Sequence, residues 1–114
     1  MATRFKRRDI AFEGKDWKNR TVTLLRDTIK RHIALYHIEE LFVVNALQSK
    51  LSSPIAVVWN PGAKSEQAVY EIPCNGHPYL QVIIKEKGWP KKALIVTFYG
   101  VDAIPKGKKL WPVQ

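Results

Sequence analysis

The sequence has a single cysteine and no long hydrophobic run. Cys74 has no partner for an internal disulfide, and no second cysteine stands near it at a metal-binding spacing. No stretch approaches the roughly 18 apolar residues of a membrane-spanning helix. The opening segment, MATRFKRRDI, lacks the apolar part of a secretory signal. We therefore expect a cytoplasmic protein with no membrane segment.

Acidic residues are also scarce, because 10 Asp and Glu stand against 19 Lys and Arg. The net charge is +9 and the isoelectric point is near 9.9. A field of this sign attracts polyanions, so nucleic acid is the first partner to consider. A solvated basic surface that only aids solubility is the alternative. Several tryptophans lie beside lysines in loop-like stretches, a pattern that suits single-stranded RNA. The residues that we expect to bind RNA are Arg7, Arg8, Arg26, Arg31, Trp89, Lys91, Lys92, Lys108 and Lys109.

The motifs of several hydrolase classes are missing as well. The sequence contains no glycine-rich phosphate loop, no GxSxG segment and no cysteine–histidine pair arranged for acyl transfer. It also lacks internal repeats and low-complexity tracts. A chain of 114 residues is then expected to form one domain with one modest core.

Hydrophobic periodicity predicts a helical region between strands. From Asp27 to the SSP stop, apolar residues recur at helical spacing. One continuous helix would place Glu40 within its apolar stripe, so a break near residues 36–38 and two helices, 27–36 and 39–51, are predicted. Segments of period two, bounded by Gly-, Pro- and Asn-rich turns, predict strands. Their ranges are 9–14, 21–25, 54–60, 67–73, 79–87 and 93–100. The expected class is α+β, with an N-terminal strand and two helices packed on a C-terminal antiparallel four-stranded sheet.

Side-chain alternation predicts two faces for the last two strands. The apolar face is expected to hold Leu80, Val82, Ile84, Leu94, Val96 and Phe98. The opposite face is expected to hold Gln81, Ile83, Lys85, Ile95, Thr97 and Tyr99. A turn centred near Lys91 would place Lys85 across from Thr97, whereas a turn centred near Trp89 would separate them along the strands. The sequence leaves both registers open. Trp59, at the end of a strand, is expected in the core.

The stretch RHIALYHIEE (31–40) contains two histidines, a tyrosine and two glutamates in an otherwise apolar region. His32 and His37 are five residues apart and would point away from each other on one helix, which disfavours a metal site. The histidines are either structural residues or acid/base groups tuned by their polar neighbours. RNA cleavage needs no metal ion when one group takes the 2′-OH proton, another protonates the leaving 5′-oxygen, and further groups stabilise the phosphorane. Histidine, lysine, tyrosine and threonine can fill these roles.

Five short motifs follow one another along the chain: HI (32–33), HIE (37–39), Pro54, VIIK (82–85) and TFY (97–99). Their order and spacing resemble the phage-associated branch of the barnase, EndoU, colicin and RelE-like (BECR) nuclease superfamily. Members of that branch typically show HI, then HPE, a proline that opens the next strand, a VVVK strand and a closing TaY. Ile38 stands where the family has proline. The resemblance covers roughly residues 21–100.

The resemblance implies a metal-independent RNase fold that often serves as a toxin or effector domain. Residues 1–20 would form a basic N-terminal arm with a short strand, and residues 21–114 a single nuclease domain. By position, His32 would be the main acid/base residue and Thr97 the contact to the phosphate, followed by Tyr99, Lys85 and Tyr70. His37 and Glu39 would belong to the second motif. An antitoxin or immunity protein would be an expected partner beside RNA.

The leading hypothesis is an endoribonuclease that acts by 2′-OH attack without a cofactor. Its catalytic residues would be His32, His37, Lys85, Thr97 and Tyr99, with Glu39 and Tyr70 in support. One alternative is a non-catalytic RNA-binding protein on the same fold. The other is a phage protein that binds a protein partner through its positive charge. The RNA target and the oligomeric state stay open.

Overall fold

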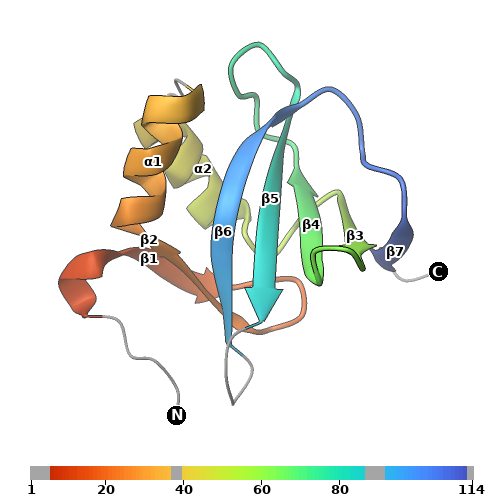
Figure 1. Cartoon of the computed structure of the whole chain (residues 1–114), viewed down its shortest axis with the longest axis horizontal. Coiled ribbons are helices and arrows are strands. Elements are labelled where there is room, and N and C mark those ends of the chain that lie inside the picture. Colours follow the sequence, from red (N-terminus) through yellow and green to blue (C-terminus); the bar gives the residue numbers. More distant parts are fainter. Residues whose placement is uncertain (1–5, 37–39, 87–91, 113–114) are drawn as a thin grey trace.

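Seven strands form one mixed sheet, and two helices pack beside it (Figure 1). The computed structural model of the chain describes residues 6–36, 40–86 and 92–112, without the side chains of residues 32–41. The elements are a short 3-10 helix η1 (Arg7–Asp9), β1 (Ile10–Lys15), β2 (Thr21–Leu25), α1 (Arg26–Tyr36), α2 (Glu40–Lys50), β3 (Ala56–Asn60), β4 (Ser65–Tyr70), β5 (Tyr79–Glu86), β6 (Lys92–Val101) and β7 (Lys108–Trp111). The α+β class is therefore confirmed.

The sheet is larger than the expected four strands. Its order is β1-β2-β6-β5-β4-β3-β7, in which β3 to β6 form the predicted antiparallel meander. β2 extends the sheet by pairing parallel to the start of β6, from Thr21 opposite Lys92 to Thr23 opposite Leu94. β7 extends the other edge by pairing with β3. The expectation of a four-stranded sheet is wrong because β1, β2 and β7 join by long-range pairing, which side-chain periodicity does not encode. β1 lies in this sheet, so residues 10–15 belong to the domain and not to a separate arm.

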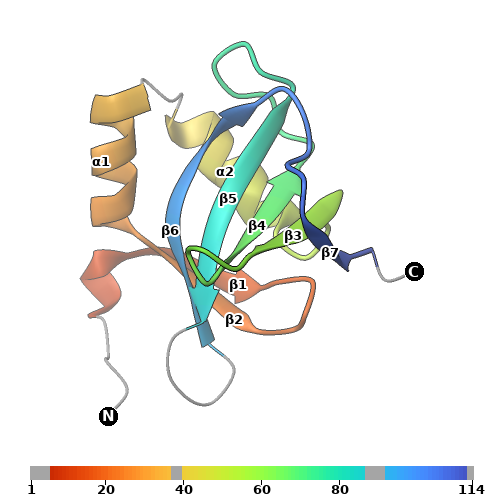
Figure 2. The ribbon, with the colours of Figure 1, turned by 45° about the vertical axis from the view of Figure 1, so that its right-hand side comes forward.

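The two helices begin and end within one residue of their predicted ranges. Of the predicted break near residues 36–38, Tyr36 is the last residue of α1, and residues 37 and 38 lie outside the described residues. α2 buries Val43 and Leu47, and Leu51 just after it, at a spacing of four that forms one apolar stripe. This stripe packs in the same core as Leu80 and Val82 of β5. Figure 2 shows α2 behind β5 and β4, and α1 beside β6. We call the side of β3 to β6 that faces α2 the inner face, and the opposite side the outer face.

A β-bulge changes which residues of β6 face the core. Ile83 lies opposite Thr97, but the next residue, Ile84, lies opposite Ile95, so Val96 is an extra residue in β6. Ala93, Ile95 and Phe98 are therefore the buried residues of the strand. The prediction that Leu94, Val96 and Phe98 share the apolar face is wrong. The extra residue at the bulge reverses the face of each residue that precedes it in β6, so Ile95 and Ala93 face the core in place of Leu94. Ile95 accordingly lies on the inner face.

A fully buried arginine ties three parts of the sheet together. Arg20, in the β1–β2 turn, is 1% exposed and donates to Asp16 at 2.7 Å and to Glu66 on β4 at 2.6 Å. It also donates to Glu86 on β5 at 3.0 Å. Burial by itself would lower the pKa of the guanidinium, but the hydrogen bonds and attraction from Glu66 and Asp16 outweigh burial and raise that pKa. Arg20 is therefore a permanent buried cation.

Replacing Arg20 leaves two buried carboxylates without a counter-ion. We expect Arg20→Met to lower the free energy of unfolding by about 3–5 kcal/mol, measured by urea denaturation. Arg31→Met is the matched control, because the 3.8 Å pair of Arg31 with Asp27 is exposed to solvent, and its loss is worth less than about 1 kcal/mol. An Arg20 variant no less stable than the Arg31 variant contradicts a structural role for the cluster.

Tyr70 is buried beside this cluster, and its hydroxyl donates to the carbonyl oxygen of Leu51 at 2.8 Å. Burial raises the pKa of Tyr70 above its usual range, and the Asp16 and Glu66 carboxylates add to the rise. The folded state thus keeps a proton that the unfolded chain loses above pH 10 or so. The stability contributed by Tyr70 is complete below that pH and falls as pH rises further. We expect the stability difference between the wild type and Tyr70→Phe to shrink between pH 9 and 11, and a constant difference contradicts this linkage.

Candidate nucleic-acid interface

The outer face of β5 and β6 brings together three residues of the sequence hypothesis. Ile83 lies opposite Thr97, Gln81 lies opposite Tyr99, and Lys85 lies opposite Leu94. Residues that are opposite, or two apart on a strand, share a face, so Lys85, Thr97 and Tyr99 are on one surface. All three side chains are partly exposed. The turn centred near Lys91 is ruled out, because Lys85 is paired with Leu94 and not with Thr97.

Tyr99 is held in place by a residue that the sequence analysis had not included among the site residues. The amide of Gln81 donates to the Tyr99 hydroxyl at 2.9 Å, and Gln81 is itself 5% exposed. A buried amide that donates to a partly exposed phenol fixes the position of the phenol. An oriented hydroxyl is a group that can contact a phosphate oxygen.

The charged side chains on the outer face of β4, β5 and β6 are lysines, and they lie among neutral polar residues and apolar ones such as Ile83 and Leu94. Glu66 and Glu86 are the acidic residues of these three strands, and both point to Arg20 on the inner side. The side chains of Lys85 and Lys92 lie on the outer face, because Lys85 is opposite Leu94 and Lys92 is two residues before Leu94 on the same strand. This surface therefore attracts anions, because no carboxylate of these strands neutralises its lysines.

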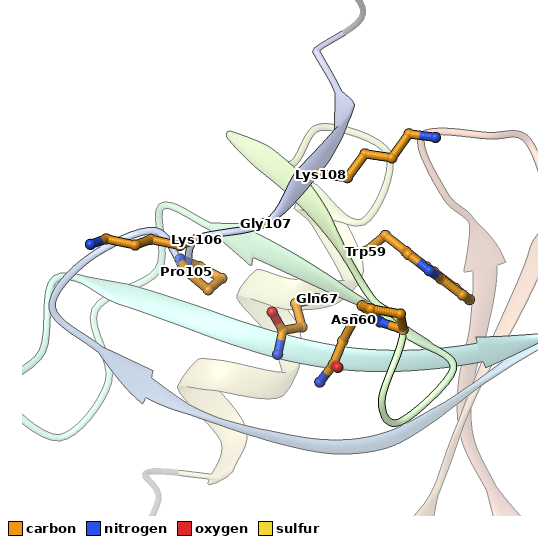
Figure 3. A pocket seen from close by; sticks show the side chains of 8 residues that line it. Trp59, Asn60, Gln67, Pro105, Lys106, Gly107 and Lys108 are labelled. Carbon is orange, nitrogen blue, oxygen red and sulfur yellow. The ribbon is translucent and has the colours of Figure 1, made fainter.

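A pocket opens on the same face, beside the segment that leads to β7 (Figure 3). It has a volume of about 590 Å³ and is lined by Trp59, Asn60, Pro61, Gln67, Pro105, Lys106, Gly107 and Lys108. We call it the Gln67 pocket. Gln67 lies opposite Ile83, which lies opposite Thr97, so the pocket and the catalytic candidates share one row across three strands. Trp59 is half-buried and lines the pocket, so its expected place in the core is wrong.

Gly107 fixes one wall of this pocket. Its φ is +145°, and a Cβ at this position would lie 2.6 Å from Cγ1 of Val58 and 3.2 Å from the carbonyl oxygen of Trp59. Only glycine allows the chain to approach β3 this closely. The segment Pro105–Lys108 is therefore held against the sheet.

The expected RNA-binding residues lie at several places on the surface. Arg7, Arg8 and Arg26 are exposed near the start of α1, where Arg26 donates to the carbonyl oxygen of Arg8 at 3.0 Å. Arg31 is exposed on α1 and Lys92 at the start of β6. Lys108 and Lys109 are exposed on β7, and Lys108 lines the Gln67 pocket. Trp89 and Lys91 lie outside the described residues.

The histidine motifs are placed only in part. His32 belongs to α1, the helix that lies against β6, but its side chain is outside the described part of the structure. His37 and Glu39 are also outside it. Tyr70 is a core residue with its hydroxyl bonded to Leu51. The supporting role expected for Tyr70 is therefore dropped, because RNA cannot reach a side chain on the inner face.

A histidine that sequence reasoning passed over has a carboxylate partner. The Nδ1 atom of His77 lies 2.7 Å from Asp102, which comes three residues after Tyr99, and both side chains are exposed. The residue types alone did not reveal the pair, because 25 positions separate them. A carboxylate on one ring nitrogen orients an imidazole and leaves the other nitrogen for proton transfer.

Two further observations concern the whole described chain. Among residues 6–36, 40–86 and 92–112, no three His, Cys, Asp or Glu side chains are placed to hold a metal ion. None of the helices in these ranges has the length and apolar character needed to cross a membrane.

Comparisons of the chain with protein-family models, with curated proteins and with solved structures found no significant match.

The glycine at the pocket wall can be tested by adding one methyl group. We expect Gly107→Ala to lower the free energy of unfolding by about 1–3 kcal/mol, because the segment must move away from Val58. Gly62→Ala is the matched control, since the nearest atom to a Cβ there is Oδ1 of Asn60 at 3.5 Å. Thermal denaturation of both variants measures the difference. Equal stability of the two variants contradicts the close approach.

Proposed function

We propose that the protein binds RNA on the outer face of β5 and β6 and cleaves it there without a metal ion. The observation that carries the proposal is the shared surface of Lys85, Thr97 and Tyr99, three of the five residues expected from the sequence to be catalytic. Lysine, threonine and tyrosine supply a positive charge and hydroxyl donors. These are the groups that bind a phosphodiester and stabilise its charged transition state.

The proton-transfer step in this proposal uses imidazole. His32 is the first candidate, because α1 lies against β6, the strand that carries Thr97 and Tyr99. One group takes the proton of the 2′-OH, the oxygen attacks the phosphorus, and a second group protonates the leaving 5′-oxygen. The products are a 2′,3′-cyclic phosphate and a 5′-hydroxyl.

RNA binding without cleavage is the second candidate function. It is favoured by the character of the outer face itself, since β4, β5 and β6 place lysines, amides, hydroxyls and the tyrosines Tyr79 and Tyr99 there, and neither a histidine nor a carboxylate. A surface of this kind binds phosphates and stacks bases. In this case the protein would bind RNA without catalysing its cleavage, and the lysines of the outer face would contact phosphates.

An RNA cleavage assay in excess EDTA separates the two functions. We expect the wild-type protein to cut labelled RNA under these conditions, and His32→Gln to lower kcat by 10²-fold or more with unchanged RNA affinity. Asn45→Ala, on the exposed side of α2, is the control variant. Cleavage that needs a divalent metal contradicts the proposal, and RNA binding without cleavage establishes the second candidate.

The salt dependence of RNA binding tests the surface itself. Lys85→Ala is expected to weaken binding to all sequences alike and to reduce the slope of log affinity against log salt by about 1. Lys50→Ala on α2 should leave the slope unchanged. An unchanged slope in the Lys85 variant contradicts the assignment of RNA to the outer face.

A further inference from the structure

We propose that the Gln67 pocket binds one base of a single-stranded RNA and makes the protein base-selective, with Asn60 and Gln67 contacting the base and Lys106 a flanking phosphate. This inference rests on the proposed RNA binding and adds a recognition site to it. The pocket volume of about 590 Å³ lies within the range of about 300–1,000 Å³ that small-molecule sites occupy. A nucleotide is a ligand of suitable size for such a pocket.

The amides of the pocket are arranged to contact one ligand. Asn60 and Gln67 come from the neighbouring strands β3 and β4, and Figure 3 shows their side chains pointing the same way. Each amide carries both a donor and an acceptor, the combination that the edge of a base requires. The Oδ1 atom of Asn60 accepts a long hydrogen bond of 3.4 Å from the backbone N–H of Ala63. A ligand donor can therefore share or replace this contact.

The charge of the pocket selects an anion. Its eight lining residues include Lys106 and Lys108 and neither an aspartate nor a glutamate. Both lysines are exposed. Lys108 lies opposite Trp59, which lies opposite Glu66, so its side chain is on the inner side, and Figure 3 shows it pointing away from Asn60 and Gln67. Lys106 is therefore the cation of the pocket rim, and a cation next to two amides fits a base with a neighbouring phosphate.

The pocket is close enough to the proposed cleavage surface for one RNA strand to contact both. Gln67 and Thr97 are separated by one strand, and the spacing of neighbouring strands makes this about 10 Å. A single strand of RNA can bridge this distance with a few nucleotides. A base in the Gln67 pocket would therefore determine which phosphate reaches Lys85 and Thr97.

The test measures affinity for RNAs of different base composition at one salt concentration. The probes are fluorescent 2′-O-methyl decamers of A, of C, of U and of alternating G and U, which have no free 2′-OH to attack. We expect the wild-type protein to prefer one probe by about 10-fold or more. Gln67→Leu should remove this preference and change the affinity for the least favoured probe by less than about 2-fold. Gln48→Leu on the exposed side of α2 is the matched control and should keep the preference.

Other results overturn the inference. These are a wild-type protein without base preference, or a Gln67→Leu variant that keeps the preference or weakens all four probes equally. Absence of RNA binding altogether refutes the proposed function, and the pocket is then tested alone by NMR with the four nucleoside 3′-monophosphates. Shifts of the Gln67 side-chain amide and the Gly107 backbone amide with one of them support a nucleotide site, and their absence refutes it.

Discussion

The buried Arg20 is the interaction on which the arrangement of the sheet depends. It joins the β1–β2 turn to β4 and β5 through Asp16, Glu66 and Glu86, and so brings the first hairpin under the meander. A buried cation with fewer partners would be strongly unfavourable, which restricts the register of three strands at once. The cluster also determines the charge of the opposite side. Because the glutamates of β4 and β5 turn inward to Arg20, the outer face keeps its lysines unneutralised.

The bulge at Val96 completes this division of the sheet. With the extra residue, Ile95 and Phe98 both enter the core, while Thr97 and Tyr99 stay on the outer face with Lys85. Without it, Leu94 and Val96 would face the core in place of Ala93 and Ile95. The glycine at position 107 then brings the last connection across β3 on this same side. Packing on the inner face thus leaves a polar, positive surface that is open to a polyanion, with a pocket at one border.

The elements that depend on local sequence pattern could be predicted, and the features that depend on pairing between distant segments could not. The helices and the meander strands follow from periodicity, and alternation placed Lys85, Thr97 and Tyr99 on one face. The parallel pairing of β2 with β6, the strand β7 and the bulge could not be predicted, since each depends on contacts between distant segments. The same reason hid the His77–Asp102 pair and the Gln67 pocket. Tyr70 was misplaced because its motif match says nothing about the direction of its side chain.

Binding of RNA to the outer face of the sheet can be measured directly by lysine footprinting. The protein is acetylated with and without a 2′-O-methyl RNA decamer, and mass spectrometry measures the extent of modification at each lysine. RNA is expected to protect Lys85 and Lys106, while Lys50 on α2 reacts equally in both samples. Protection of Lys50 with none at Lys85 would contradict binding at this face.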